Sequence, residues 1–407
     1  MTMAKRRNKQ RVNNAAVPSS SLVRGSDGYS MFAMPSNAGV PVTESTAMNS
    51  TALYACIQLI GGAIASLPLP IYERTSKGRE RVDHPLWWLL NEQPVARMSA
   101  STFWRYMMTS KLLHGDGFAL IKRKSPFSPE IVSITPWHPL AVNVYLNGDR
   151  LAYQFINYIG GHGIESQMYD QDDVLHFTGV GFNGLRSVSP LRHALRNAAG
   201  IALAADKYSA EFFSASAKPE IVIKTEMAKL SGDQKELIID AWKSIQQGDR
   251  TRPGVLGAGM SLQELTINAE EAQLLQSRMF QIEDIARIYG VPPFMIGHTQ
   301  NTTSWGSGVE QMGIGFVKYT LSQHIVDAEQ EINRKLFLTE KNFCEFNTAG
   351  LERGDIKTRN ESYRIGLGRA GEPAWLTVNE VRAAENLPPK EGGDVLFVST
   401  APTGGAF

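Results

Sequence analysis

Two long helical segments on either side of a compact insert constrain the fold of this chain more than any other feature of its sequence. The first begins with Ser189, a residue type that favours the helix N-cap, and Pro190, which suits the first helical position. Its stripe of apolar residues and alanines continues to about Ser214, and the second segment runs from Asn268 to about residue 290. Because alanines permit close approach of neighbouring helices, the first segment predicts a close-packing helix on the order of 35 Å long.

The insert between these helices, residues 216–265, has signals for both strands and a helix. EIVIKT predicts a strand, the capping-box pattern from Ser231 to Gln234 opens a helix through Trp242 and Ile245, and GVLGAGMSLQEL predicts a hairpin. Two long helices therefore bracket a small α/β unit.

The first 188 residues predict a mixed α+β module. Apolar residues recur at steps of three and four from about residue 49 until Pro68, which predicts one helix, and HPLWWLLNEQP and STFWRYMMTSKLLHG predict two more. Short strand candidates lie around these helices: LPIYER, GFALIKR, EIVSITPW, AVNVYL, LAYQFI and DVLHFT.

The C-terminal third begins with a loop and continues as a long helix. VPPFMIGHTQNTTSWGSG combines prolines with small polar residues, a pattern typical of loops. Apolar residues at helical spacing then predict a third long helix over residues 309–338. A short helix follows near the end, where Thr377 and Glu380 form a capping box and Pro388 marks the stop.

The charge of the chain is unevenly distributed. Residues 1–45 hold six of the 41 basic residues but only Asp27 and Glu44 of the 40 acidic ones, which leaves the remainder nearly neutral, with 35 basic and 38 acidic residues. This tail is rich in Ser, Asn, Gly and Pro and has no apolar period, so we expect it to be disordered. It is either a solvated arm or a segment that touches nucleic acid.

Composition excludes several classes of protein. The chain of 407 residues is 43% hydrophobic and 20% charged, which is typical of a soluble globular protein with two or more modules. No apolar window is long and uninterrupted enough to predict a membrane span, and no secretory signal is visible. The two cysteines, Cys56 and Cys344, predict neither a disulfide framework nor a zinc site, and a reducing cytosol fits them. The eight histidines show no HExxH pairing, so no metal site is predicted.

One motif raises the hypothesis of a nucleotide-dependent enzyme. Gly179, Gly181 and Gly184 spell GxGxxG between a strand candidate and a helix. In a dinucleotide site the third glycine lies in the first turn of the helix, but here the predicted cap is Ser189, five residues further on. The expected acidic residue would be Asp206, which falls inside the predicted helix. The glycines therefore predict a flexible connector from sheet to helix, with no cofactor and no enzymatic activity.

Six segments between residue 45 and about 397 form an ordered series: ALYACIQLIGGAIASLPLPIYER, HPLWWLLNEQP, SPLRHALRNAAGIALAADKYSAEFF, QSRMFQIEDIARIYGVPPFMIG, TTSWGSGVEQMGIGFVKYTLSQHIVDAEQEINRKLF and WLTVNEVRAAENLPPKEGGD. Together, and in this order, they resemble the portal proteins of tailed bacteriophages, of the type found in long-tailed lambda-like viruses. Two local departures from the family pattern are HGDGFALI, where a Gly-Asn-Ala-Tyr run is common, and Met312, where a second glutamine is frequent.

The resemblance implies a portal fold and a ring of twelve subunits, a homododecamer, at one capsid vertex. Double-stranded viral DNA would pass through the channel of this ring during packaging and ejection. The implied partners are the large terminase subunit, a head-tail connector and the major capsid protein, with no membrane. The location would be the virion, after assembly in the bacterial cytoplasm. The implied parts are a basic tail (1–45), a wing (46–188), a first stem helix (189–214), a clip (215–267), a second stem helix (268–291), a tunnel-loop region (292–308), a long helix (309–338), and a wing return with a helical crown (339–407).

The resemblance also implies functional residues on these parts. Arg192 and Arg196, four residues apart on the first stem helix, would either face the channel or form ion pairs between neighbouring stems. Arg250 and Arg252 of the clip would contact partner proteins. The tunnel loop that meets DNA would consist of Gln300, Asn301, Thr302, Thr303, Ser304 and Trp305, with Trp305 either packing beneath the loop or touching the DNA.

A nearly neutral body suits a conduit, because each neutralised phosphate adds a salt-dependent grip that would oppose sliding. A rival hypothesis, a sequence-specific DNA-binding protein, needs a concentrated basic face and a recognition helix. Neither is evident outside the tail.

Overall fold

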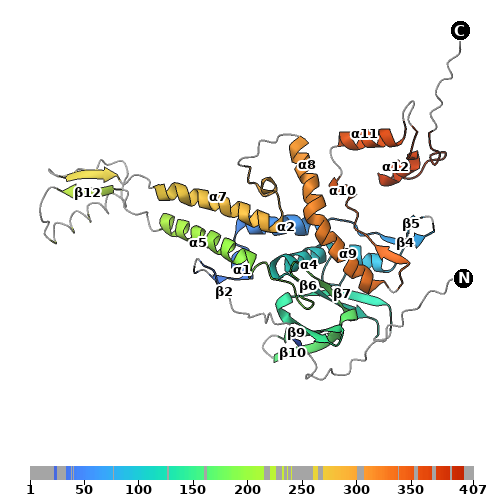
Figure 1. Cartoon of the computed structure of the whole chain (residues 1–407), viewed down its shortest axis with the longest axis horizontal. Helices are drawn as coiled ribbons and strands as arrows, with labels where there is room; N and C mark the ends of the chain where they lie inside the picture. The colour runs from blue at the N-terminus through green and yellow to red at the C-terminus, as the bar shows by residue number, and fades with distance from the viewer. Residues whose placement is uncertain are drawn as a thin grey trace, which may run out of the picture.

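A computed structural model gives the fold of the chain (Figure 1). It describes residues 23–24, 34–37, 39, 41–214, 221–225, 232, 236, 240, 260–264, 269–299, 307–352, 356–368 and 373–397. Within these ranges, positions 77, 126–127, 160–162, 338 and 386 are left out. Helices and antiparallel sheets are mixed along the chain, as the sequence predicts.

The centre of the molecule is a layer of helices. Helix α2 (Thr51–Ala65) packs along α4 (Ala100–His114), and Gly61 of α2 faces Arg105 and Met108 of α4. Ser99 caps α4 by accepting the N–H of Thr102. The apolar faces of α2 and α4 form the main core together with part of α9 (Ser322–Leu336).

Two antiparallel sheets lie against this layer. The first has the strand order β11-β6-β7 and the second β1-β8-β9-β10, and a small apolar core that includes Phe118, Tyr153 and Phe155 lies between them. Strand β10 was not predicted, because its sequence is mostly polar, yet it pairs with β9 along its whole length. The strands are β1 (Val23–Arg24), β6 (Gly117–Arg123), β7 (Ile131–Trp137), β8 (Val142–Asn147), β9 (Arg150–Ile159), β10 (Gly163–Asp170) and β11 (Val174–Phe177), with short 3-10 turns η2 (Pro139–Ala141) and η3 (Gln171–Asp173).

A third sheet brings the C-terminal part of the chain back to the first. Its strand order is β14-β4-β5, formed by Asn342–Cys344, Ile71–Thr75 and Gly78–Arg81. Helix α3 (Leu86–Asn91) follows, and the Asn91 side chain ties it to the segment just before β4 by bonding both the N–H and the carbonyl of Leu69.

The two long helices extend from this body side by side. They are α5 (Ala194–Ser214) and α7 (Ala269–Tyr289), and the ribbon of β12 (Ile221–Thr225) and β13 (Met260–Glu264) lies at their far end (Figure 1). The prediction that the first helix begins at Ser189 is wrong. Residues 190–193 form turns, and the Ser189 hydroxyl bonds elsewhere instead of capping the helix.

The prediction of a disordered tail up to residue 45 is wrong for its last part. Strands β2 (Met34–Pro35) and β3 (Pro41–Val42) pair, and α1 (Glu44–Ala47) follows with a capping box at Thr43. These elements are too short to show a period in sequence, and contacts with α5 hold them. We call residues 34–47 the strap.

The third long helix is interrupted in its middle. Helix α8 (Ser307–Gly315) continues through a π-helical segment, η5 (Phe316–Leu321), into α9. Such segments are rare and occur frequently at functional sites. Within η5 the Thr320 hydroxyl donates to the carbonyl of Gly290 at 2.6 Å, directly after α7.

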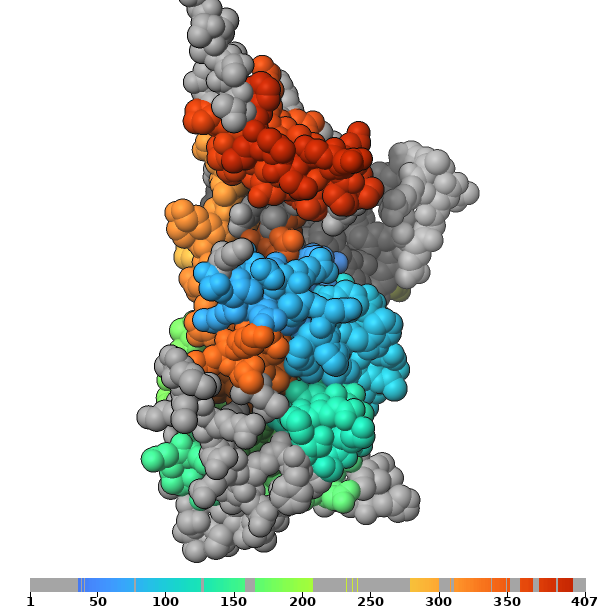
Figure 2. Space-filling model, turned by 90° about the vertical axis from the view of Figure 1, so that its right-hand side faces the viewer, coloured from blue at the N-terminus to red at the C-terminus, as the bar shows by residue number. Residues whose placement is uncertain are grey.

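The C-terminal helices form a separate group at one end of the molecule (Figure 2). After α10 (Ala349–Glu352) come α11 (Ile356–Gly366) and α12 (Val378–Ala384). The predicted capping box of Thr377 and Glu380 opens α12, with both reciprocal hydrogen bonds formed.

Candidate functional site at the end of helix α4

Residues 112–116, the sequence Leu-Leu-His-Gly-Asp, form a hub at the C-terminal end of α4. The helix stops at His114, and Gly115 takes the left-handed conformation (φ 86°) that commonly ends helices. The last carbonyls of a helix have no partner within it. The hub uses two of them to hold other parts of the chain.

Both long helices are anchored to the hub. The Tyr289 hydroxyl, at the end of α7, donates to the carbonyl of Leu112 at 3.1 Å. The carbonyl of Leu113 accepts the Leu191 N–H and the Ser189 hydroxyl, each at 3.1 Å, just before α5 begins. The main core extends to the base of both helices. It includes Leu191 just before α5, Leu195 and Ala199 in α5, and Ile285 and Tyr289 in α7.

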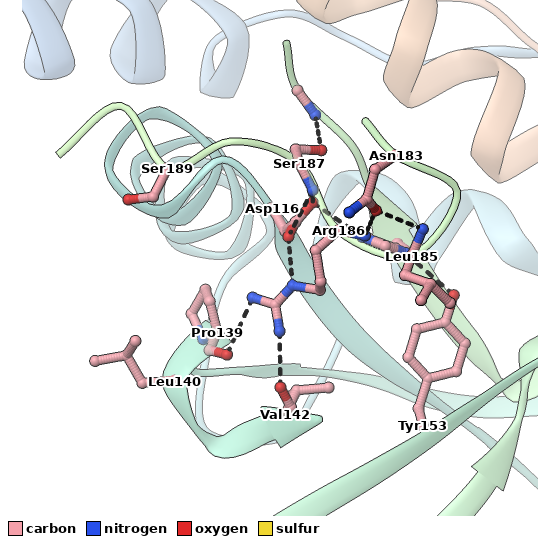
Figure 3. Close-up of polar contacts among 12 residues, drawn as sticks. Asp116, Pro139, Leu140, Val142, Tyr153, Asn183, Leu185, Arg186, Ser187 and Ser189 are labelled. Carbon is pink, nitrogen blue, oxygen red and sulfur yellow. Dashed lines mark hydrogen bonds and ion pairs between the residues drawn. The ribbon is translucent and has the colours of Figure 1, made fainter. Parts of the chain in front are cut away.

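Asp116 holds the connector between β11 and α5, which we define as residues 178–193. Its carboxylate is fully buried and accepts the Arg186 Nε–H at 2.6 Å and the Ser187 N–H at 3.1 Å (Figure 3). Burial alone would raise the pKa of Asp116, but bonding to His176 and the charge of Arg186 outweigh it, so the pKa lies below its ordinary value. Asp116 therefore carries its charge at neutral pH.

The guanidinium of Arg186 crosses from the connector to the second sheet. It donates to the carbonyls of Val142 at 2.8 Å and Pro139 at 3.4 Å (Figure 3), and it lies 4.8 Å from the centre of the Phe118 ring. Arg186 is only 4% exposed, so both its charge and its hydrogen bonds are satisfied inside the protein. This one side chain joins the first sheet, the second sheet and the connector.

His176 extends the network toward α9. Burial lowers its pKa, so the imidazole is neutral at neutral pH. It then donates through Nε2 to Asp116 and accepts the Tyr153 hydroxyl at Nδ1, each at 3.1 Å. The backbone N–H of His176 donates to Glu331, which also pairs with Lys335 on the same helix at 3.0 Å.

The glycines of the connector serve close packing. A Cβ on Gly179 would lie 2.6 Å from the carbonyl oxygen of Gly115, and one on Gly181 (φ 71°) would lie 2.7 Å from the Val188 side chain. Gly115 itself is limited in the same way, because its Cβ would be 2.4 Å from the Val188 carbonyl oxygen. Gly115, Gly179 and Gly181 therefore leave no room for a side chain, whereas Gly184 has open space around its Cβ position, and the flexibility of the connector stays a prediction.

The geometry also contradicts a phosphate cradle at these glycines. The backbone N–H of Gly179 donates to the Ser187 hydroxyl, and that of Val188 donates to the carbonyl of Val180. Those of Leu185 and Arg186 donate to the Asn183 side chain. A nucleotide site needs such N–H groups free to meet phosphate oxygens. In addition, β11 pairs antiparallel with β6, whereas the dinucleotide fold needs parallel strands.

His114 of the hub fastens the strap. One oxygen of Glu44 lies 3.2 Å from Nε2 of His114 and 3.0 Å from Nε2 of His138. These bonds, first that of His114 and then that of His138, hold the pKa of Glu44 far below its ordinary range. The strap also touches α5, where Gly200 leaves room for Ser36, since a Cβ at Gly200 would lie 2.3 Å from the Ser36 side chain.

Two imidazoles and a carboxylate are a donor set that metals use. The second ring nitrogen of His138, Nδ1, favours a hydrogen-bonded cluster over a metal site. Nδ1 of His138 accepts the Leu140 N–H at 3.2 Å, whereas a histidine that binds metal through Nε2 must carry a proton on Nδ1. Glu44, His114 and His138 therefore form a hydrogen-bonded clasp. Sequence motifs could not find it, since its members are far apart in the chain.

The structure places only some of the predicted functional residues. Arg192 and Arg196 lie at the base of α5 and are both half-buried. Among the described residues no hydrogen-bond partner meets the buried Nε of Arg196. Gln300 to Trp305, Arg250 and Arg252 lie outside the described residues. The hub was not predicted as a site, although HGDG, where the sequence departs from the family pattern, was its signal.

Comparison with known proteins identifies the class. Residues 51–386 match the family described as phage portal protein. The portal protein of Enterobacteria phage HK97 is 31% identical over 361 residues, which cover 87% of this chain and 82% of that protein. The chain therefore belongs to the phage portal protein family, the structural proteins of the capsid vertex and neck of the virion.

Solved structures share the fold. A chain in the virion of a native gene transfer agent particle has a TM-score of 0.63 at 19% identity and covers 85% of this chain and 92% of its own length. A chain in the neck of such a particle, computed with C12 symmetry, has a TM-score of 0.61 at 18% identity with the same coverage. Among the described helices of the present chain, none has the length and apolar character to cross a bilayer.

Proposed function

We propose that this chain assembles into a dodecameric ring at one capsid vertex, with a channel for double-stranded DNA during packaging and ejection. The observation that carries the proposal is the common anchoring of α5 and α7 on the hub, within a chain of the portal family. A ring closed by rotation needs rigid elements at each contact, and paired helices fixed to one helix end supply such an element. The neck with C12 symmetry that contains a similar chain supports the subunit number.

In this ring the two long helices are the stem, and the segment between them is the clip. The clip, with Arg250 and Arg252, docks the large terminase subunit and later the head-tail connector, while the wing faces the major capsid protein. Gln300, Asn301, Thr302, Thr303 and Ser304 line the channel as replaceable polar contacts for sliding DNA, and Trp305 packs beneath them. The nearly neutral composition of the chain beyond residue 45 supports a channel without strong grip.

Arg192 and Arg196 act at contacts between neighbouring stems in this proposal. The support is the buried Nε of Arg196, which has no hydrogen-bond partner among the described residues of its own subunit. A buried donor without a partner is unfavourable. A carboxylate on the next stem would remove this penalty.

Electron microscopy of the purified protein, alone and assembled with capsid protein, tests the proposal. We expect rings with a central hole and twelve-fold class averages after assembly with capsid protein. Monomers or dimers under every condition would contradict it. The alternative from the sequence, a nucleotide-dependent enzyme, is opposed by the geometry at Gly179 to Gly184. Absence of any stabilisation by nucleotides in a thermal-shift screen would remove it, because a bound ligand stabilises the folded state.

A further inference from the structure

The C-terminal helices lack the buried apolar side chains that a folded segment normally has. Within residues 359–368, 373–385 and 387–397, where the structure describes side chains, the buried residues are Gly366, Asn379 and Gly393. None of the large apolar side chains in these ranges belongs to either hydrophobic core. Seven of them are exposed, and we call this set the crown face: Ile365 (45%), Trp375 (64%), Val378 (44%), Leu387 (49%), Val395 (72%), Leu396 (44%) and Phe397 (59%).

The exposed crown face contrasts with the helix that precedes it in the chain. In α9 the apolar stripe is covered within the subunit, since Ile325, Ile332 and Leu336 are each no more than 4% exposed. The subunit therefore buries this stripe of α9 and leaves the apolar residues of the crown face in solvent.

Polar contacts nevertheless give the crown segment a defined backbone. The Asn379 side chain donates to the carbonyl of Lys390 and accepts its N–H, at 2.9 and 2.8 Å, which folds residues 387–394 back onto α12. Glu385 of α12 accepts the Tyr363 hydroxyl of α11 at 2.8 Å and pairs with Arg359 at 3.2 Å. The two helices are therefore joined by specific bonds and present the crown face in a fixed arrangement.

These bonds are too weak to keep the segment folded alone. Exposed ion pairs contribute about 0 to 1 kcal/mol, and helices shorter than about 12 residues are marginal in water. Ordering one residue costs about 1 to 2 kcal/mol, which apolar burial must offset. An exposed apolar face on an ordered segment is typical of an interaction site.

We propose that the crown face packs against a neighbouring copy of this chain, so that residues 359–397 complete their hydrophobic core only in the assembled ring. The inference rests on the proposed ring. Rotation about the ring axis places the same segment of each subunit beside that of the next, and such a head-to-tail contact covers one copy with another without needing any further protein. The position of α11 and α12 together at one end of the subunit suits a continuous belt of this kind (Figure 2).

Hydrogen exchange on separated subunits and rings tests the proposal. We expect amides of residues 359–397 to exchange at least about ten-fold more slowly in rings than in subunits, while amides of α2 change little. Trp375→Ser combined with Val378→Ser should remove this protection or prevent assembly, with the melting temperature of the subunit unchanged. Trp375→Phe should retain it, and Glu361→Gln, a polar change on the same helices, is the matched control.

The possible outcomes separate this inference from the ring itself. Wild-type rings with crown amides as exposed as in the subunit would overturn the inference and leave the proposed function intact. Absence of rings from the wild-type protein contradicts both. A third outcome would also overturn the inference: the crown amides are already protected in the subunit, and cutting the chain after residue 397 removes that protection. This result would show that the chain's own last residues cover the crown face.

Discussion

The carboxylate of Asp116 and the guanidinium of Arg186 form a fully enclosed ion pair, with 2.6 Å between Oδ2 and Nε. The two residues are 70 positions apart, one at the end of α4 and the other in the connector that leads to α5. Their contact fixes the path of the chain from the sheets into α5. The placement of α5 relative to the sheets therefore depends on an electrostatic contact inside one subunit.

Asp116→Asn should destabilise the subunit by about 3 to 5 kcal/mol, because it leaves the buried charge of Arg186 without its partner. Thermal or urea unfolding measures this loss. Glu130→Gln removes one partner of the exposed Lys124 pair and should change stability by less than about 1 kcal/mol. If the pair is coupled, adding Arg186→Leu to Asp116→Asn should cost less than the sum of the two single changes. Equal effects of the Asp116 and Glu130 variants would contradict the role of the hub.

Gly115→Ala should be strongly destabilising. The left-handed backbone at this position costs a residue with a Cβ about 1 to 3 kcal/mol, and the contact with the Val188 carbonyl adds to that. Gly62→Ala is the matched control, because Gly62 lies in the regular helix α2 with open space around its Cβ position. This control should be neutral or stabilising by up to about 1 kcal/mol. Comparable melting temperatures for the two variants would show that close packing at Gly115 does not matter.

Glu44→Gln should loosen the strap at neutral pH and have less effect in acid. Because the folded-state pKa of Glu44 lies below its ordinary value of 4.5, the carboxylate stabilises the protein above that pH and loses its contribution as pH falls further. The clasp is partly exposed, so we expect at most about 1 kcal/mol. Limited proteolysis within residues 34–47 measures the loosening. A difference from wild type that grows below pH 4.5 would contradict the assignment.

Local patterns in the sequence predicted the elements of this fold better than their ends and connections. Helical spacing predicted α2, α4 and α7, because their apolar stripes meet the main core directly, and the capping box of Thr377 and Glu380 predicted α12. The start of α5 was misplaced, since Ser189 and Pro190 have the preferences of a helix start but the Ser189 hydroxyl bonds to Leu113. The π-helical segment η5 was missed for a related reason, as its apolar residues continue the helical spacing on either side.

The hub was beyond sequence analysis because its contacts join distant positions. Asp116 and Arg186, or Glu44 and His138, are separated by 70 and 94 residues, whereas helix and turn rules relate residues a few positions apart. The glycines at 179, 181 and 184 illustrate the limit. Their spacing predicted a connector, but only the backbone of Gly115 explains why a Cβ is excluded at Gly179, and only the side chain of Val188 explains it at Gly181, whereas Gly184 has open space around its Cβ position.

Replacing Gln300 to Ser304 with glycine should impair DNA packaging or retention and leave the rings intact. The substitution removes the polar side chains that contact DNA in the proposed channel but changes none of the described contacts of the hub. Packaged DNA per particle, measured beside ring yield in electron micrographs, separates the two effects. Lys124→Gln, at an exposed surface position, is the control. Normal packaging and retention would refute a functional tunnel loop.

His324 should make the subunit sensitive to mild acid. Burial, together with the nearby charge of Lys111, lowers its pKa from 6.5 to about 4, and no hydrogen-bond partner meets its buried Nδ1 among the described residues. Below pH 6.5 the unfolded chain therefore binds a proton that the folded chain does not, so stability falls as the pH drops from 6.5 toward 4 and then levels off. At 1.36 kcal/mol for each pKa unit, the loss amounts to at most about 3 kcal/mol.

His324→Gln should flatten this part of the pH profile, because glutamine has no charge to gain. Melting temperatures at intervals between pH 7 and pH 4 measure it, with the exposed His193→Gln as control. The control should keep the wild-type slope, because it leaves His324 in place. Parallel profiles for wild type and His324→Gln would place the acid sensitivity elsewhere, and a steeper fall in the variant would reverse the sign of the argument. If the pH profile of the melting temperature flattens only in His324→Gln, acid first weakens the region where His324 and Asp327 of α9 meet Lys111 of α4.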